Sequence, residues 1–241
     1  MLREKQPLRL RSPKRRSPPV KNPQRRNKLL EAYRLLSDSF GPRHWWPAET
    51  PFEVMVGAIL TQNTNWKNVE KAIENLKKAQ VLSPQKLYNL PPTTLAKLIQ
   101  PAGYFRVKAK RLRHFLKYFL ETYGGDVKKM EAGSLEKLRA ELLGVNGIGP
   151  ETADSILLYA LNKPIFVIDA YTKRVLNRHG LCAEDDGYEE LQNIFMDNLK
   201  PDVSLYNEYH ALVVEVGKEF CRTTPKCSQC PLNGWNWEKR R

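Results

Sequence analysis

The chain has 241 residues, of which 41% are hydrophobic, and its formal net charge is +14 at pH 7. This length is enough for one or two domains with a substantial hydrophobic core. The excess of positive charge indicates a polyanionic partner, either nucleic acid or an anionic membrane surface. No apolar run is long enough to span a membrane, and the basic start lacks the apolar segment of a secretory signal, so neither an integral membrane protein nor a secreted one is expected.

Much of the charge lies in the first 27 residues, where ten Lys and Arg residues and a single Glu give a net charge of +9. Five prolines in the same stretch, the last of them Pro23, disfavour a regular helix. We therefore expect residues 1–27 to form a disordered basic arm that adds salt-sensitive, sequence-independent affinity for DNA. A tail that only improves solubility is the alternative.

From residue 28 onward, apolar residues recur at helical spacing almost throughout, and no useful alternating strand pattern or internal repeat is found. The stretch 52–60 is apolar on nearly every side, as expected for a helix in the middle of a core. A long basic helix is expected over 105–123, where two glycines end it. Other helices are expected from about 29 to 40, from 66 to 76, after the Ser83 N-cap, after the Ser134 N-cap, and over 170–179, 189–199 and 204–220. The sequence therefore predicts an all-α fold.

A glycine-rich turn, VNGIGP at residues 145–150, separates two of these helices. Pro150 fits the first position of the second helix, where its missing N–H is not needed. Gly147 and Gly149 are expected to adopt positive φ and to leave the backbone amides uncovered. Outward-pointing amides at a helix N-terminus bind anions, and for a basic protein the natural anion is a DNA phosphate.

A lone carboxylate, Asp169, follows the apolar run 165–168 and opens the helix expected over 170–179. Its position suits an N-cap. A carboxylate at the edge of apolar packing, close in sequence to a phosphate-binding turn, also suggests chemistry on DNA.

The turn, the following Thr152-Ala153 and the spacing to Asp169 together resemble the helix-hairpin-helix DNA glycosylase superfamily, the relatives of endonuclease III. The resemblance extends from about residue 52 to residue 230. It implies a six-helix barrel domain over 52–165 that ends in the hairpin, and a second helical domain made of residues 28–51 and 166–241. DNA would bind in the cleft between the two domains, with Asp169 at its mouth.

The resemblance also assigns residues to DNA. Hairpin residues Gly147, Ile148, Gly149 and Thr152 would grip the backbone of double-stranded damaged DNA. Gln62, in the segment LTQNT, would enter the duplex when the target base is flipped out. A polar residue at a helix end is the alternative for Gln62.

For Asp169 the resemblance implies the role of invariant catalytic acid. Breaking an N-glycosidic bond builds positive charge on the sugar, which a carboxylate can stabilise while it accepts a proton from the attacking water. Lyase-competent relatives have a lysine two residues after the second hairpin glycine. This chain has Glu151 there, and a glutamate forms no imine. We therefore expect a monofunctional glycosylase that leaves an abasic site, and we interpret Glu151 as a first-turn acid favoured by the helix dipole.

The aromatic residues point to a substrate class. Trp46, Pro47 and Trp66, with the segments around them, resemble the 3-methyladenine DNA glycosylase branch, which implies that they wall the base pocket. An alkylated purine is positively charged, so it gains cation–π energy from an electron-rich ring. The alternatives are ordinary core tryptophans, a glycosylase for a mismatched or oxidised base, and a non-catalytic helix-hairpin-helix protein that only binds DNA.

Cys221, Cys227 and Cys230 resemble the iron–sulfur loop of the family, but the first spacing is one residue short and Asn236 occupies the fourth cysteine position. A 4Fe–4S cluster normally needs four thiolates. A cluster with a different fourth ligand, another metal such as zinc, and no metal at all are the three options. The cysteine usage favours a reducing compartment. We expect a monomer in the cytoplasm at the nucleoid, or in the nucleus if the source has one, with DNA and no membrane as its partner.

Overall fold

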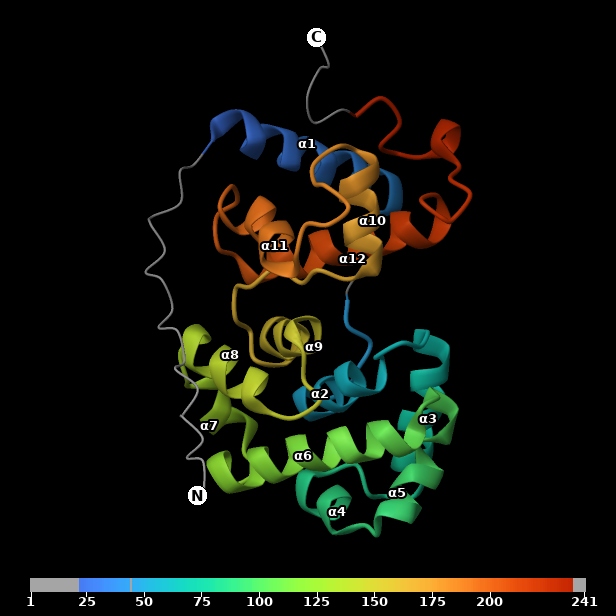
Figure 1. The fold of residues 1–241 in the computed structure, drawn as a ribbon, viewed down its shortest axis with the longest axis vertical. Helices are drawn as coiled ribbons and strands as arrows, with labels where there is room; N and C mark the ends of the chain where they lie inside the picture. Colours follow the sequence, from blue (N-terminus) through green and yellow to red (C-terminus); the bar gives the residue numbers. More distant parts are fainter. Residues whose placement is uncertain (1–21, 44, 236–241) are drawn as a thin grey trace, which may run out of the picture.

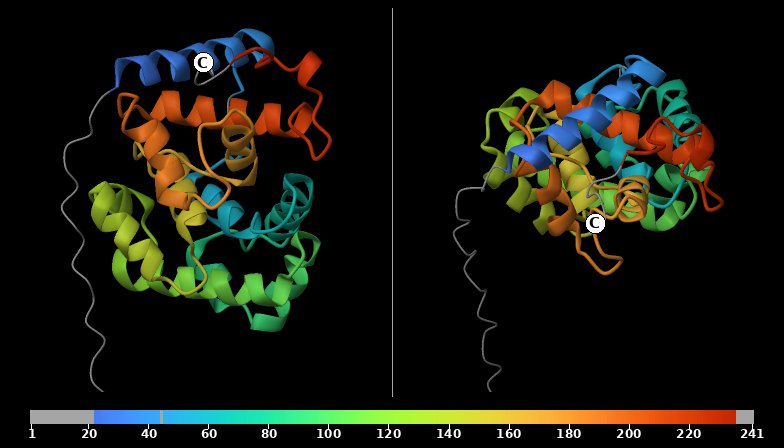
Figure 2. Two further views of the ribbon diagram at one scale, coloured as in Figure 1. Left: turned by 45° about the horizontal axis from the view of Figure 1, so that its top comes forward. Right: turned by 90° about the horizontal axis from the view of Figure 1, so that it is seen from above.

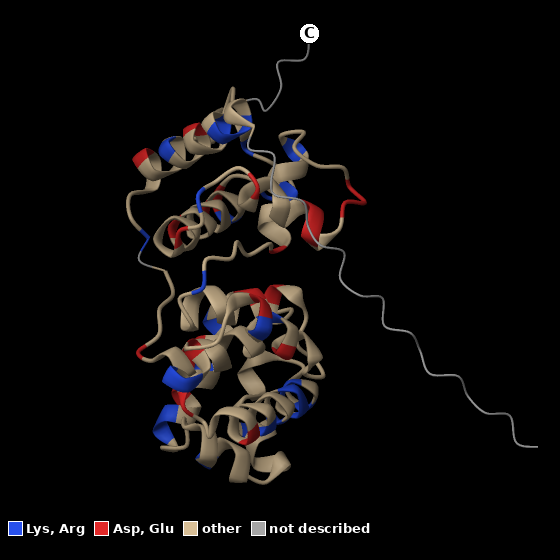
Figure 3. Cartoon of the chain, turned by 90° about the vertical axis from the view of Figure 1, so that its left-hand side faces the viewer, with Lys and Arg blue, Asp and Glu red and all other residues tan. Residues whose placement is uncertain are grey.

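A computed structural model of the chain describes residues 22–43 and 45–235, and within these ranges it contains helices and no strand. The all-α prediction is therefore confirmed. The helices form two groups along the long axis of the molecule (Figure 1). Lys and Arg residues are distributed over both groups (Figure 3). No described helix has the length and hydropathy that crossing a membrane requires.

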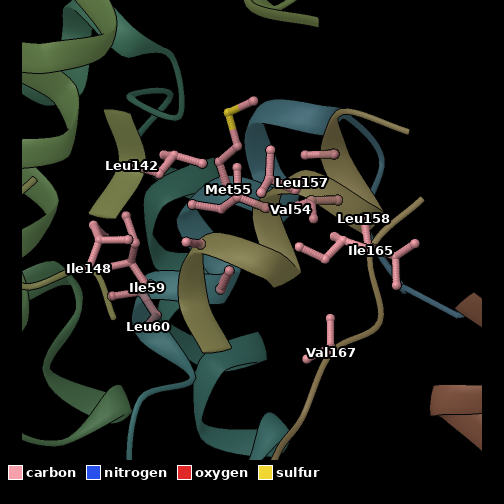
Figure 4. Close-up of a cluster of buried hydrophobic side chains, with 14 of the residues drawn as sticks. Val54, Met55, Ile59, Leu60, Leu142, Ile148, Leu157, Leu158, Ile165 and Val167 are labelled. Atoms are coloured by element: carbon pink, nitrogen blue, oxygen red, sulfur yellow. The ribbon is translucent and has the colours of Figure 1, made fainter. Parts of the chain in front are cut away.

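The first group surrounds α2, Pro51–Leu60, in which every residue from Phe52 onward is buried. The side chains of Met55 and Ile59 from α2 lie with Ile148 and Leu157 in one hydrophobic cluster (Figure 4). Because α2 is covered on all sides, it forms the centre of this group. The surrounding elements are α3 Trp66–Lys78, α4 Pro84–Asn89, α5 Pro92–Leu98, η1 Gln100–Ala102, α6 Phe105–Tyr123, α7 Val127–Glu131, α8 Leu135–Gly144, α9 Pro150–Ser155 and the π-helical turn η2 Ile156–Ala160.

The second group joins the two ends of the chain. It contains α1 Pro23–Phe40, α10 Ala170–Arg178, α11 Tyr188–Met196, α12 Val203–Glu219 and η3 Cys227–Gln229. Helix α12 packs against both α1 and α10, and α1 runs across its outer side (Figure 2). The Tyr209 hydroxyl donates to the carbonyl of Leu29 at 2.8 Å, and the Phe166 and Phe195 rings stack with centroids 3.7 Å apart. The N-terminal helix is thus an integral part of this group.

A buried polar bridge connects the two groups. The fully buried Asp154 of α9 accepts from Arg139 Nε of α8 at 2.8 Å and from Gln192 Nε2 of α11 at 2.7 Å. The same Gln192 amide donates to the carbonyl of Phe166 at 2.6 Å. These hydrogen bonds connect α11 to the hairpin helices α8 and α9. Removing Arg139 would leave the buried charge of Asp154 uncompensated, so we expect its loss to be strongly destabilising.

The boundary expected for the basic arm is wrong by several residues. Helix α1 begins at Pro23, and the Asn22 side chain caps it by accepting from the amides of Gln24 and Arg25. Pro23 occupies the first helical position, where a proline is favourable rather than disruptive. Residues 23–27 are therefore helical, and the remainder of the expected arm, residues 1–21, lies outside the described residues.

A candidate active-site cleft lined by the hairpin and Asp169

A cleft of about 820 Å³ is lined by elements of both helix groups. Apart from Pro47, it brings together all of the catalytic, DNA-binding and base-pocket residues expected from the sequence. Its lining includes Trp46, Gln62, Trp66, Gly147, Ile148, Gly149, Thr152 and Asp169. Pro47 is exposed and does not line the cleft, so its expected place in the base pocket is not what the structure shows.

The hairpin turn lies between α8 and α9 and forms one edge of the cleft. Gly147 has φ +94°, as expected, and a Cβ there would overlap Cγ of Arg111. Gly149 is extended, with φ −95°, so the expectation of positive φ at this residue is wrong. A Cβ at Gly149 would meet no described atom within 4 Å, and no side chain caps α9. Gly149 thus leaves the first amides of α9 open to the cleft.

Gln62 is held by three hydrogen bonds in this structure. Its Nε2 donates to the carbonyl of Gly147 and to Oγ1 of Thr152, both at 3.0 Å. Its Oε1 accepts from Arg111 at 2.6 Å. Gln62 therefore connects the hairpin with α6, and entry into a DNA duplex would require exchanging these bonds. The buried Lys108 holds the same region, because its ammonium donates to the carbonyls of Leu60 and Ala102 at 2.8 and 2.7 Å.

Asp169 caps a helix and also lines the cleft. It is the N-cap of α10, and its Oδ1 accepts from the amide of Thr172 at 2.7 Å. Its side chain is 15% exposed and faces the cleft. A carboxylate fixed by a backbone amide and still open to a cleft is preorganised to stabilise positive charge there.

Behind Asp169 lies a buried pair that sequence reasoning missed. The Tyr159 hydroxyl lies 2.5 Å from Nδ1 of His210, whose Nε2 is 3.8 Å from Oδ1 of Asp169. Burial lowers the pKa of His210, although the Asp169 charge opposes this effect, and burial raises the pKa of Tyr159. A protonated Tyr159 donates to Nδ1 of a neutral imidazole, which places the His210 proton on Nε2, facing Asp169.

Glu151, at the second position of α9, lines the cleft with Asp169. The residue is exposed to solvent as a whole, while protein atoms around its carboxyl group partly desolvate that group. This burial and, secondarily, the charge of Asp169 raise the pKa of Glu151 to about 7. The place of Glu151 directly after the hairpin is the sequence signal for its presence in the site, although the same place equally predicts a helix first turn.

Aromatic rings form a corner of the cleft. The Trp46 and Trp66 rings meet edge to face, with centroids 5.0 Å apart, and the Tyr159 ring lies 5.1 Å from Trp46. Gly57 of α2 provides room for both indoles, which lie 3.5 Å from the position a Cβ would take. On the neighbouring Trp45, the ammonium of Lys218 lies 5.1 Å from the ring centroid. The rings of Trp46 and Trp66 are therefore perpendicular walls rather than two sides of a parallel slot.

The cysteine loop does not fit a cluster that needs four thiolates. Cys221, Cys227 and Cys230 line one pocket, but among the described residues no three His, Cys, Asp or Glu side chains form a group that could hold a metal ion. The expected fourth position, Asn236, lies outside the described residues and is not a cysteine.

Two arginines of α10 hold the start of this loop instead. Arg174 Nε donates to the carbonyl of Cys221 at 2.6 Å. The Arg178 guanidinium donates to the carbonyls of Arg222 and Thr223 and lies 3.4 Å from Sγ of Cys221. Protein hydrogen bonds thus fix the chain where it leaves α12.

Comparison with known proteins gives the family. Residues 56–201 match the model of the HhH-GPD superfamily base excision DNA repair proteins. The chain belongs to this superfamily. It is 50% identical over 206 residues to "Putative DNA repair glycosylase MJ1434" of Methanocaldococcus jannaschii, covering 85% of this chain and 93% of that protein. It is 32% identical to endonuclease III of Thermotoga maritima, over 76% of this chain and 80% of that enzyme.

Solved structures agree with this assignment. The H. pylori 3-methyladenine DNA glycosylase MagIII, bound to 1,N6-ethenoadenine, superposes with a TM-score of 0.69 and 30% identity over 79% of this chain and 97% of that chain. A non-covalent endonuclease III–DNA complex has the same fold, with a TM-score of 0.75 and 21% identity over 88% of this chain and 94% of that chain. The HhH-GPD chain described here is therefore a DNA repair glycosylase, an enzyme that hydrolyses N-glycosidic bonds.

Proposed function

We propose that this glycosylase excises alkylated purines, with 3-methyladenine as the leading substrate, by simple hydrolysis that leaves an uncut abasic site. The observation that carries the proposal is the composition of the cleft. It places Asp169 and two tryptophans together with a carboxyl, Glu151, next to the hairpin. An aspartate and aromatic walls, with a glutamate rather than a lysine at position 151 directly after the hairpin, favour hydrolysis of a base that stacks on indole rings.

The positions of two described lysines, Lys173 and Lys218, support the hydrolytic part of the proposal. Lys218 is the only lysine among the described residues that line the cleft, and its ammonium packs on the Trp45 ring. Lys173, one turn after Asp169, donates to the carbonyl of Asp186 instead. An imine requires a free amine that reaches the sugar, and neither lysine is placed as one.

The aromatic corner supports the substrate class. Purines methylated at a ring nitrogen are cationic, and a cation stacked on tryptophan gains about 0.5–2 kcal/mol that an undamaged base does not. The positive charge also weakens the glycosidic bond, so electrostatic stabilisation of the sugar by Asp169 is sufficient catalysis for such a lesion. The likeness to MagIII, a 3-methyladenine DNA glycosylase, points in the same direction.

The test is release of free bases from duplex DNA treated with dimethyl sulfate, identified by chromatography. We expect wild-type protein to release 3-methyladenine. Asp169→Asn should release none while it binds DNA as well as wild type, because asparagine is an equally good N-cap and preserves the start of α10. No release from this DNA, together with release from parallel duplexes that carry an oxidised or mismatched pyrimidine, would contradict the substrate class, and DNA binding without release from any of these duplexes would contradict catalysis.

A further inference from the structure

Glu151 is an unusual carboxyl for a helix first turn. Its side chain makes no hydrogen bond or ion pair with any described residue, whereas the first-turn Glu53 of α2 accepts from Lys77 at 2.9 Å. It does not cap α9, since the N-cap is Gly149 and no side-chain cap bond forms there. Interaction with the helix dipole needs no hydrogen bond, so the first-turn role of Glu151 leaves its carboxyl available for a second role in the cleft.

The surroundings of Glu151 disfavour its charge. It shares the cleft with Asp169, and the two carboxyls repel each other when both are ionised. The amide of Thr172 fixes the Asp169 carboxylate in the cleft, and the raised pKa of Glu151 keeps the Glu151 carboxyl protonated up to about pH 7. Glycoside hydrolases likewise use two carboxyl groups that flank the reacting sugar carbon. One of them stabilises charge and the other transfers a proton.

We infer that Glu151 is the general base of base excision, the group that takes the proton from the water attacking the sugar while Asp169 stabilises the sugar cation. This inference rests on the hydrolytic function proposed above. The water oxygen bonds to C1′, the C1′–N bond breaks, and its electron pair leaves with the base. The proton released from the water passes to the Glu151 carboxylate and then to solvent. A cationic purine leaves as the neutral base, so charge and atoms balance without a second acid.

The charged groups around the cleft permit a clear pH test. Besides Asp169, the titratable and charged side chains that line it are Arg111, Tyr171, Tyr188, His210 and Lys218. Burial lowers the pKa of His210 and raises that of Tyr188 well above its usual range. Glu151, whose pKa is raised to about 7, is thus the group expected to change charge between pH 6 and pH 8.

The experiment measures single-turnover release of 3-methyladenine from dimethyl sulfate-treated duplex DNA between pH 5.5 and 8.5. A base works only when ionised, so the wild-type rate should rise through about pH 7 and then level off. Glu151→Gln should be about 10²-fold slower at pH 8 and should lack this rise. At pH 5.5, where only about 3% of Glu151 is ionised, the two rates should differ by only about threefold.

A matched control is Glu136→Gln, since Glu136 is exposed at the same second position of α8 and does not line the cleft. It should keep the wild-type rate and pH profile. A Glu151→Gln variant with the wild-type rise at pH 7 would overturn the inference and leave the proposed function intact. A wild-type protein that releases no base would instead remove the proposed function, so the two failures are distinguishable. Affinity for an abasic-analogue duplex, unchanged in Glu151→Gln, reports that the variant is folded.

Discussion

The different surroundings of the two hairpin glycines allow us to predict how alanine substitution at each changes the stability of the protein. A Cβ at Gly147 would overlap Cγ of Arg111 and lie 2.9 Å from its Cδ, and residue 147 would still have to adopt φ +94°. The left-handed backbone costs an alanine about 1–2 kcal/mol. Displacing the Arg111 stem also breaks its bond to Gln62, a charged hydrogen bond worth about 1.5–3 kcal/mol. We expect Gly147→Ala to lose about 3 kcal/mol of stability.

For a chain of this length, 3 kcal/mol corresponds to a fall in Tm of about 6–12 °C, measured by circular dichroism. Gly149→Ala is the control in the same turn, because Gly149 is extended and faces open space. That substitution should leave Tm unchanged or raise it slightly, since a compatible Gly→Ala change gains about 0.4–1 kcal/mol. Equal Tm values for Gly147→Ala and wild type, or equal losses in both variants, would refute the contact between the hairpin and α6.

Three further predictions follow from charges and loops. Because folding raises the pKa of Glu151, its stabilising contribution is present below the unfolded-state pKa and is lost as pH rises through about 7. Glu151→Gln should therefore be more stable than wild type at pH 8 but not at pH 4, and equal denaturation midpoints at pH 8 would argue against the raised pKa. Removal of residues 1–21, which precede the Asn22 cap, should weaken binding to damaged and intact DNA alike and reduce the salt dependence of log Kd; an unchanged slope would mean that this segment does not contact DNA. Treatment with a metal chelator should leave Tm unchanged, whereas Arg178→Ala should lower it, and the opposite pattern would indicate a metal in the cysteine loop.

The sequence predicted a helix well where both its apolar stripe and its terminating residue could be recognised. The basic helix α6 spans Phe105–Tyr123 as expected, because its apolar stripe ends before Gly124. This glycine is the C-cap: it adopts φ +64°, and its backbone N–H donates to the carbonyl of Leu120. The start of α1 was missed because a proline was counted as a helix breaker although it occupies the first position. The π-helical turn η2 was not predicted, since a segment buried on nearly all sides carries no periodicity from which its winding can be inferred.

The cleft was predictable where its residues lie on recognisable motifs, which are the hairpin with Asp169 and the segments around Trp46, Gln62 and Trp66. Glu151 directly follows the hairpin turn, and Asp169 comes 18 residues after Glu151, so the spacing of these residues is visible in the sequence. Tyr159 and His210 are 51 residues apart, and only the fold brings them together behind Asp169. The raised pKa of Glu151 likewise depends on the walls of the cleft and on the distance to a second carboxyl, which no spacing rule supplies.

The central claim is that a water positioned between two carboxyls, rather than a lysine, attacks the sugar. The most direct measurement uses an end-labelled duplex that carries a single methylated purine, followed by electrophoresis with and without alkali and by borohydride trapping. We predict full-length strands that break only after alkali, with no covalent protein–DNA adduct. Strand cleavage without alkali, together with an adduct that survives denaturation and disappears in Lys218→Ala or Lys173→Ala, would contradict the account.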